Sequence, residues 1–314
     1  MGKVKLNEVY KPLYTSDKRY FLVTGGRGSL KSTTVHDFIC RLTYSPGQGI
    51  LFTRYTMTSA EKSIIPEFKE TLKRNGSEDN FHITKDKAIN LTTGSFIIFS
   101  GIKTSAGNQT ANLKSLAGIT TWVIEEGEDF NDERAFDTID DSVRSSLMQN
   151  RVIWIQNPST KEHFIYQRWI AETNKKIKVN GYDVTVSSHP EVEHIHTTYH
   201  IALEYLSKSF VRKAELSEQN NNKWYYHNYI GGWLEKAEGV IFENWEEGNF
   251  DESIPYVYGM DFGVVDPDTL IKVGIDKSQR KLYLKEMMYD NGQSSKELFE
   301  VLENIIDNKN DLIV

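Results

Sequence analysis

The chain has 314 residues, of which 39% are hydrophobic and 26% are charged. This length exceeds that of a usual single core and the aromatic content is that of a folded protein, so we expect about two ordered domains. The single cysteine, Cys40, excludes a disulfide framework or a thiolate zinc cage within the chain. No apolar run is long enough to cross a bilayer, so we expect a cytosolic protein. The net charge of −7 argues only weakly against a nucleic-acid partner, because phosphate contacts depend on local charge.

The first half of the chain alternates apolar runs with helical patterns. Strands are predicted at residues 19–24, 50–53, 121–124 and 152–155, with a hairpin formed by 88–91 and 95–100. Helices are predicted at residues 32–44, 59–75 and 132–148. This alternation is typical of an α/β domain, with a mainly parallel sheet that helices flank on both faces.

The second half of the chain carries weaker signals. After Gln156 the periodicity fades, and a helix-like pattern rich in Tyr and Trp returns over residues 203–233. The acidic segment 243–253 interrupts this pattern and is the predicted linker between a domain at 1–242 and a domain at 254–314. In the second domain the predicted elements are strands at 256–260, 269–275 and 281–288, a helix at 295–306 and the start of a strand at 312–314.

A glycine-rich turn joins the first predicted strand to the first predicted helix. Its residues are Gly25, Gly26, Arg27, Gly28, Ser29, Leu30, Lys31, Ser32 and Thr33. Such a turn directs backbone N–H groups and the helix dipole toward an anion, so it predicts a triphosphate site. Lys31 would reach the outer phosphates and the Ser32 hydroxyl would coordinate Mg²⁺. The consensus has glycine where this chain has Leu30, which leaves a purely structural turn as an alternative.

Polar residues end two later strands of the same domain. Glu125 and Glu126 follow the apolar run 122–124, and the first is predicted to hold Mg²⁺ while the second polarises the attacking water. Asn157 follows the next strand, where it would lie beside the γ-phosphate and sense its presence. The alternatives are two surface glutamates and an ordinary Asn-Pro turn.

Together these segments resemble the large terminase subunit of tailed double-stranded DNA bacteriophages. The resemblance rests on Gly-Gly-Arg-Gly-Ser-x-Lys-Ser at 25–32, Trp-Val-Ile-Glu-Glu at 122–126, Asn-Pro-Ser at 157–159 and Tyr-Gly-Met-Asp-Phe-Gly at 258–263. It covers nearly the whole chain. It implies a P-loop packaging ATPase that uses ATP and Mg²⁺, followed by the first part of an RNase H-like nuclease domain.

The resemblance also implies roles for single residues. Arg27 would sense or stabilise the γ-phosphate, Glu126 would be the catalytic carboxylate and Asn157 the coupling residue. In the second domain Asp261 matches the first metal-binding aspartate of the nuclease, with Glu286 as its helper for Mg²⁺ or Mn²⁺. The family's second metal-binding aspartate is expected beyond the strand at 312–314, so we expect this chain not to cut DNA.

The partners that the resemblance implies are those of a packaging motor. They are double-stranded DNA, the portal protein of the procapsid, the small terminase subunit and further copies of the same chain in a ring. The expected location is the cytoplasm of the infected bacterial host, without a membrane.

Two other functions remain open at this point. One is another P-loop nucleotidase, such as a helicase-like DNA translocase or a GTPase, although a helicase would normally carry a second motor domain. The other is a non-catalytic DNA-binding or capsid-interaction module, for which Leu30 is the best support. The guanine-reading sequence Asn-Lys-Asn-Asp at 308–311 follows a predicted helix rather than a strand, so we interpret it as coincidence.

Four histidines lie close together in the sequence. His189, His194, His196 and His200 make a zinc site conceivable. Without cysteine partners or a known ligand spacing, we favour solvated or hydrogen-bonding histidines over a zinc site.

Overall fold

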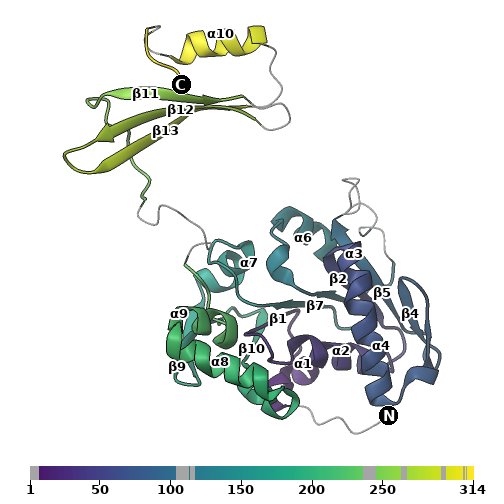
Figure 1. Ribbon diagram of the computed structural model, residues 1–314. Coiled ribbons are helices and arrows are strands. Elements are labelled where there is room, and N and C mark those ends of the chain that lie inside the picture. The colour runs from purple at the N-terminus through teal and green to yellow at the C-terminus, as the bar shows by residue number, and fades with distance from the viewer. Residues whose placement is uncertain are drawn as a thin grey trace. The chain divides into compact units, whose positions relative to one another are not determined.

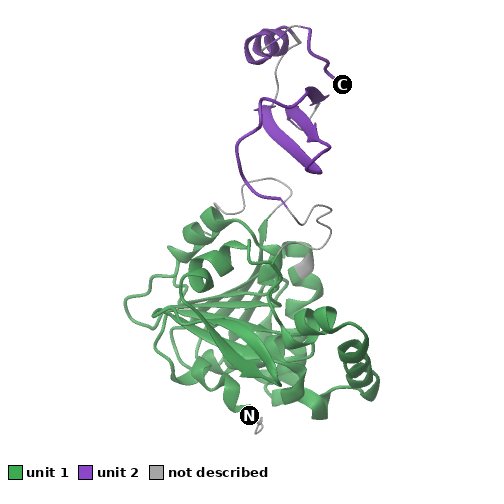
Figure 2. Ribbon diagram, turned by 90° about the vertical axis from the view of Figure 1, so that its left-hand side faces the viewer, with its two compact units in different colours: residues 1–240 green, residues 241–314 purple. Residues whose placement is uncertain are grey.

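The computed structural model describes residues 7–103, 113, 117–235, 245–262, 267–290, 295–306, 308 and 310–314. The chain divides into two compact units, residues 1–240 and 241–314 (Figures 1 and 2). Sequence patterns place the end of the first domain at residue 242, two residues later than this division. Parts of three predicted features lie outside the described residues, namely the linker residues 243 and 244, Gly263 of the 258–263 motif and Lys309 of the guanine-reading sequence.

Unit 1 is built on an eight-stranded sheet with the strand order β10-β1-β7-β6-β2-β5-β4-β3. The strands are β1 (Tyr20–Gly25), β2 (Gly49–Thr56), β3 (Phe81–Ile83), β4 (Lys87–Asn90), β5 (Phe96–Lys103), β6 (Thr121–Ile124), β7 (Arg151–Gln156) and β10 (Val192–Thr197). The six strands from β10 to β5 are parallel, and β4 and β3 are antiparallel. The predicted mainly parallel α/β sheet is therefore confirmed, as is the hairpin of β4 and β5.

Helices cover both faces of this sheet (Figure 1). Successive residues of β1 point to opposite faces, so Phe21 and Val23 belong to one buried cluster and Leu22 to another. The first cluster includes residues of α2 (Lys31–Leu42) and α4 (Ile64–Asn75), and the second includes residues of α6 (Glu133–Asp140) and α7 (Phe164–Tyr166). The continuous apolar runs that predicted these strands reflect burial on both sides.

Two of the predicted helices are shorter than expected. The helix predicted at 59–75 is split at Ser63 into α3 (Met57–Lys62) and α4, because Pro66 cannot donate a helical hydrogen bond and restricts the preceding backbone. The helix predicted at 132–148 ends at Asp140, where the Arg19 guanidinium donates to the carbonyls of Asp140 and Val143. Long-range contacts therefore end this helix.

The antiparallel pair β8 (Asn174–Val179) and β9 (Tyr182–Ser187) was not predicted. Asn180 and Gly181 between them both have positive φ, which is the Asn-Gly signature of a tight hairpin. This hairpin packs on the helix-like stretch after residue 203, which contains α8 (Lys208–Asn220), α9 (Asn222–Tyr225) and a π-helical turn at Tyr226–Ile230. The signal was present in the sequence, but the adjacent strands have little continuous apolar character.

Unit 2 contains an antiparallel sheet of β11 (Tyr256–Asp261), β12 (Asp268–Asp276) and β13 (Lys281–Asp290), followed by α10 (Ser295–Ile305). Its small core includes residues from β11, β12, β13 and α10. Residues 312–314 lie parallel to β11, with Met260 N donating to the Val314 carbonyl and Val314 N donating to the Tyr258 carbonyl. Within the described residues of both units, no helix has the length and apolar character to span a membrane.

The histidines of β10 are joined by a chain of hydrogen bonds. His194 Nδ1 accepts from the Ser187 backbone N–H at 2.7 Å, so its Nε2 is the nitrogen that donates to Thr24 Oγ1. Thr24 then donates to His196 Nδ1 at 2.8 Å, and His196 Nε2 donates to the Ile230 carbonyl at 2.9 Å. All four ring nitrogens are engaged, so these two histidines join β1 and β10 rather than offering lone pairs to zinc.

We predict that acid destabilises unit 1 through His196. Burial lowers the pKa of His196 to about 4. The unfolded chain, in which histidine titrates near 6.5, therefore binds the proton more readily between these two values. Lowering the pH from 7.5 to 5 is expected to cost about 2 kcal/mol of unfolding free energy through this residue. Urea unfolding of wild type and His196→Gln at both pH values measures it, and an equal pH effect in the two proteins contradicts the assignment.

Candidate nucleotide-binding site

The strand order brings the three predicted motifs to one edge of the sheet. β7 lies between β1 and β6, and all three run in the same direction, so their carboxyl ends lie together. These ends border a cleft of about 1050 Å³. The predicted site residues that line the cleft are Arg27, Gly28, Lys31, Ser32, Thr33, Glu125, Glu126 and Asn157. Gly25, Gly26 and Ser29 do not line it and instead shape the loop.

The glycine-rich loop is held against its neighbours on both sides. Gly25 has φ 149°, and a Cβ atom there would lie 2.0 Å from the Thr197 carbonyl oxygen, so no other residue fits. The Ser29 hydroxyl donates to the Gly26 carbonyl at 2.8 Å, and the Tyr10 hydroxyl donates to the Ser29 carbonyl at 2.7 Å. Tyr10 was not predicted as a site residue, because its contact with the loop is made only in the folded chain.

Leu30 occupies the position where the consensus has glycine. The backbone conformation at this position explains why glycine is preferred there. It lies in the left-handed region, with φ 61° and ψ 20°, immediately before α2 begins. Such a conformation costs a residue with a side chain roughly 1–2 kcal/mol. The turn therefore keeps the shape that glycine would give it, and the departure from the consensus does not remove the loop.

Lys31 is buried and fully engaged. Its ammonium donates to the carbonyls of Gly25 and Gly26 at 2.8 and 2.9 Å, to the Ser29 hydroxyl at 3.3 Å and to Asn157 Oδ1 at 3.0 Å. Burial lowers the pKa of Lys31 to about 8, although the nearby carboxylate of Glu128 opposes this shift. The ammonium therefore remains mostly protonated at neutral pH and lies at the edge of the cleft.

Asn157 connects the lysine to a carboxyl group that sequence patterns did not single out. Its Nδ2 donates to Glu128 Oε1 at 2.9 Å while its Oδ1 accepts from Lys31. Burial raises the pKa of Glu128, against the opposing effects of hydrogen bonds and the Lys31 charge. The chain Lys31–Asn157–Glu128 thus joins the loop after β1, the end of β7 and the turn after β6.

Glu125 and Ser32 offer the oxygen ligands that a magnesium ion requires. Glu125 is buried, with 3% of its surface exposed. Burial alone would raise its pKa, but its neighbour His36 and then, to a smaller extent, Ser32 and the charge of Arg54 hold the pKa below its usual value. A hydroxyl and a carboxylate that line the same cleft fit an ion that prefers hard oxygen ligands. These two residues are the ones that would hold Mg²⁺.

The side chain of Glu126 lies in a different environment from that of Glu125. The Glu126 backbone is left-handed, with φ 51°, and its side chain is half exposed and forms an ion pair with Arg54. Arg54 stands at the end of β2 and also donates to Ser63 Oγ at 2.7 Å. The two adjacent glutamates therefore have separate environments, one buried beside Ser32 and one at the open side of the cleft with a guanidinium partner. Arg54 was not predicted, because β2 ends in no recognisable motif.

The remaining predicted catalytic and metal-binding residues are exposed. Arg27 is exposed at the cleft, and its backbone N–H donates to the Asn228 carbonyl at 2.8 Å. In unit 2, Asp261 ends β11 and Glu286 lies on β13, with β12 between them. Both are exposed, and the register puts them on the same face of that sheet.

A parallel sheet with a glycine loop, a buried lysine and strand-end carboxylates around one cleft defines a P-loop nucleotidase. Comparison with known proteins narrows this class. The family model described as phage terminase large subunit matches residues 17–232. This chain belongs to that family.

Individual relatives agree with the family assignment. The large terminase subunit of Bacillus phage SPP1 is 27% identical over 323 residues, which cover 94% of this chain and 72% of the relative. The large terminase of a thermophilic bacteriophage has a TM-score of 0.57 at 15% identity, covering 99% of this chain and 77% of that one. The large terminase ATPase domain of Thermus phage P74-26 has a TM-score of 0.51 at 12% identity, covering 73% and 94% of the two chains.

The solved structures of the thermophilic bacteriophage terminase include complexes with ADP and with ATP-γ-S. At such low identity these likenesses show the fold alone. They confirm the α/β architecture that the alternating pattern predicted, and the family assignment confirms the resemblance.

We predict that residue 30 tolerates glycine and rejects β-branching. Leu30→Gly keeps the left-handed turn at no steric cost, so we expect unfolding free energy to change by less than about 1 kcal/mol. Leu30→Val is expected to lose about 1 kcal/mol or more, because a β-branched residue is poorly accommodated at positive φ. Urea unfolding of the three proteins gives the comparison, and a Val variant as stable as wild type would refute this account of the loop.

Proposed function

We propose that this protein hydrolyses ATP at the cleft between β1, β7 and β6 and uses the reaction to move duplex DNA. The observation that carries the proposal is the convergence of Lys31, Glu125 and Asn157 on one cleft from three separate strands. The triphosphate would lie along the loop, where it meets backbone N–H groups and the start of α2. The Lys31 ammonium would exchange its carbonyl partners for phosphate oxygens.

The two glutamates divide the chemistry between them. Ser32 and Glu125 would hold Mg²⁺, which supplies charge stabilisation to the phosphates when it is bound. Glu126, at the open side of the cleft, would orient the attacking water and accept its proton. Its ion pair with Arg54 fixes the direction of the carboxylate. Arg27, exposed beside the loop, would add positive charge near the γ-phosphate.

Asn157 would report the state of the nucleotide to the rest of the domain. Asn157 forms hydrogen bonds with both Lys31 and Glu128. A phosphate that draws the Lys31 ammonium away would break the first of these bonds. The end of β7 and the turn after β6 would then respond to the γ-phosphate. This coupling is the step through which hydrolysis would become movement.

The family assignment and the SPP1 relative, which is named a large terminase subunit, support the partners that we propose. The substrate to be moved would be double-stranded DNA entering a procapsid in the infected bacterial cytoplasm. The protein would act there as a ring of identical copies docked on the portal, with the small terminase subunit as a further partner.

Asp261 and Glu286 are proposed as part of a metal-dependent nuclease site in unit 2. Their support is the common exposed face of the β11–β13 sheet. A site with two metal ions needs several carboxylates, and these two side chains stand on strands separated by β12. We therefore expect no linearisation of supercoiled plasmid by the 314-residue chain with Mn²⁺, as judged by gel electrophoresis. Cleavage that Asp261→Asn abolishes would contradict this expectation.

The other P-loop activities can be separated by nucleotide preference. A GTPase would bind GTP better than ATP, and competition between the two nucleotides distinguishes them. A module that keeps only the fold would bind neither in a calorimetric titration.

We predict that Glu126→Gln lowers ATP turnover by at least about 100-fold while leaving ATP-γ-S binding nearly unchanged, because the variant loses only the proton acceptor. Lys31→Ala is expected to weaken binding as well, since the phosphates lose their ammonium partner. Steady-state phosphate release and calorimetry measure the two effects. Asp129→Asn, an exposed neighbour at the same cleft, serves as the control with wild-type turnover. Undiminished turnover in Glu126→Gln sinks the proposed role.

A further inference from the structure

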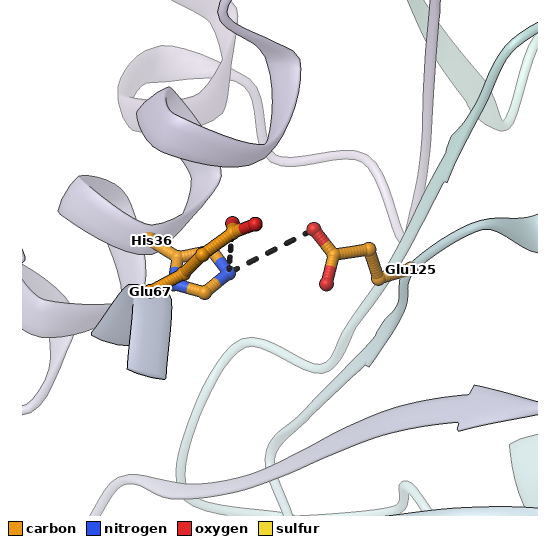
Figure 3. Close-up of side chains that lie close together, drawn as sticks. All are labelled: His36, Glu67 and Glu125. Carbon is orange, nitrogen blue, oxygen red and sulfur yellow. Dashed lines mark ion pairs between the residues drawn. The ribbon is translucent and has the colours of Figure 1, made fainter. Parts of the chain in front are cut away.

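A group of three metal-ligating side chains lines the nucleotide cleft, and two of them, His36 and Glu67, have no role in the function proposed above. His36 on α2, Glu67 on α4 and Glu125 after β6 point toward one another (Figure 3). His36 Nε2 lies 3.8 Å from Glu67 Oε2 and 3.8 Å from Glu125 Oε1. The three ligand atoms all lie within 4.8 Å of one another.

The imidazole at the centre of this group lacks hydrogen-bond partners. His36 is fully buried, and neither of its ring nitrogens has a hydrogen-bond partner among the described residues. Its ring packs against Phe52 and Phe68, with centroid distances of 4.8 and 6.4 Å. Among the same residues, Glu125 Oε2 is also buried without a partner. Buried polar atoms are normally satisfied, and the two ion-pair contacts of His36 Nε2 at 3.8 Å are too long for hydrogen bonds, so these atoms point to a bound species.

The spacing fits an ion better than direct hydrogen bonds. A hydrogen bond between imidazole and carboxylate would bring the atoms to about 2.7–3.2 Å, which is shorter than the distances found here. With metal–ligand bonds of about 2.0–2.2 Å, two atoms 3.8 Å apart subtend roughly 120–145° at an ion between them. An open tetrahedral site, with angles of about 109°, needs ligand atoms about 3.3–3.6 Å apart, so these atoms have to approach one another by a few tenths of an ångström.

We propose that His36, Glu67 and Glu125 bind a divalent transition-metal ion, of the kind represented by Zn²⁺, with a water molecule completing the coordination. One imidazole nitrogen and two carboxylates suit such an ion, whereas Mg²⁺ prefers oxygen ligands alone. The site differs from the one formed by Ser32 and Glu125, although Glu125 belongs to both. Ser32 and His36 are four residues apart on α2 and therefore share a helix face toward Glu125.

The ion would join three elements, of which α2 and α4 already meet through hydrogen bonds from Arg74 and Asn75 to Asp37. α2 begins at the phosphate loop, α4 carries Glu67, which lines the cleft, and Glu125 directly follows the end of β6. Glu67 has half of its side chain exposed, so its carboxylate can move the few tenths of an ångström that closing the site requires. The inference goes beyond the proposed ATPase activity, and it is tested without nucleotide.

The test is Zn²⁺ binding to the full chain. Protein freed of metal with a chelator is dialysed against micromolar Zn²⁺ in the presence of millimolar Mg²⁺, and bound zinc is measured by mass spectrometry. We expect one tightly bound Zn²⁺ per wild-type chain and a rise in melting temperature on binding. Glu67→Gln is expected to weaken the affinity at least about tenfold and to abolish that rise.

Glu70→Gln is the matched control. Glu70 stands on the same helix and lines the same cleft, but it is not a member of the group. This variant should bind zinc like wild type. His36→Gln tests the central ligand, with circular dichroism to confirm folding. The absence of stoichiometric zinc in wild type, or wild-type affinity in Glu67→Gln, would overturn the proposal and leave the nucleotide site untouched.

Discussion

The position of β7 between β1 and β6 is the constraint on which the site depends. Parallel pairing of these three strands puts the glycine loop, Asn157 and the two glutamates at one edge of the sheet. Each segment is short and carries little chemical meaning alone. The sheet gives them a common location, and the apolar residues on both faces of the strands hold that location fixed.

Lys31 is the side chain that connects the glycine loop to the other residues at this edge of the sheet. A buried ammonium needs acceptors on every side, and it finds them in two loop carbonyls, one hydroxyl and one amide. The Asn157 contact extends this set to Glu128 and hence to the turn after β6. In the mechanism we propose, a phosphate that competes for the ammonium would act on the ends of both strands, β7 and β6. Nucleotide binding would thereby be linked to a change of structure.

Much of the fold was predictable because its strands are buried on both faces. The runs at β1, β2, β6 and β7 are short and continuously apolar, and their ends carry the motifs. β8 and β9 were missed because polar residues alternate along them, although Asn180-Gly181 marked their turn. The ends of α4 and α6 depend on Pro66 and on a contact from Arg19, and only the first of these is local in the sequence.

The site was predictable where residues adjoin a strand end and unpredictable where they arrive from elsewhere. Glu125 and Asn157 follow their strands directly, and Lys31 follows β1 after the glycine-rich turn. Tyr10, Arg54 and Glu128 reach the same region only through the folded chain, as do His36 and Glu67. Leu30 was the strongest argument against a working loop. Its left-handed backbone shows that the turn tolerates leucine, so sequence identity and conformation have to be judged separately.

The central claim is that the Lys31 ammonium exchanges its loop carbonyls for phosphate. A crystal structure of the chain with ATP-γ-S and Mg²⁺ tests it most directly. We expect Lys31 Nζ within hydrogen-bonding distance of the outer phosphates, with the contacts to Gly25 and Gly26 broken and Ser32 and Glu125 around the ion. Nucleotide bound elsewhere, or a lysine that keeps its contacts with both carbonyls while the nucleotide is present, would contradict the account.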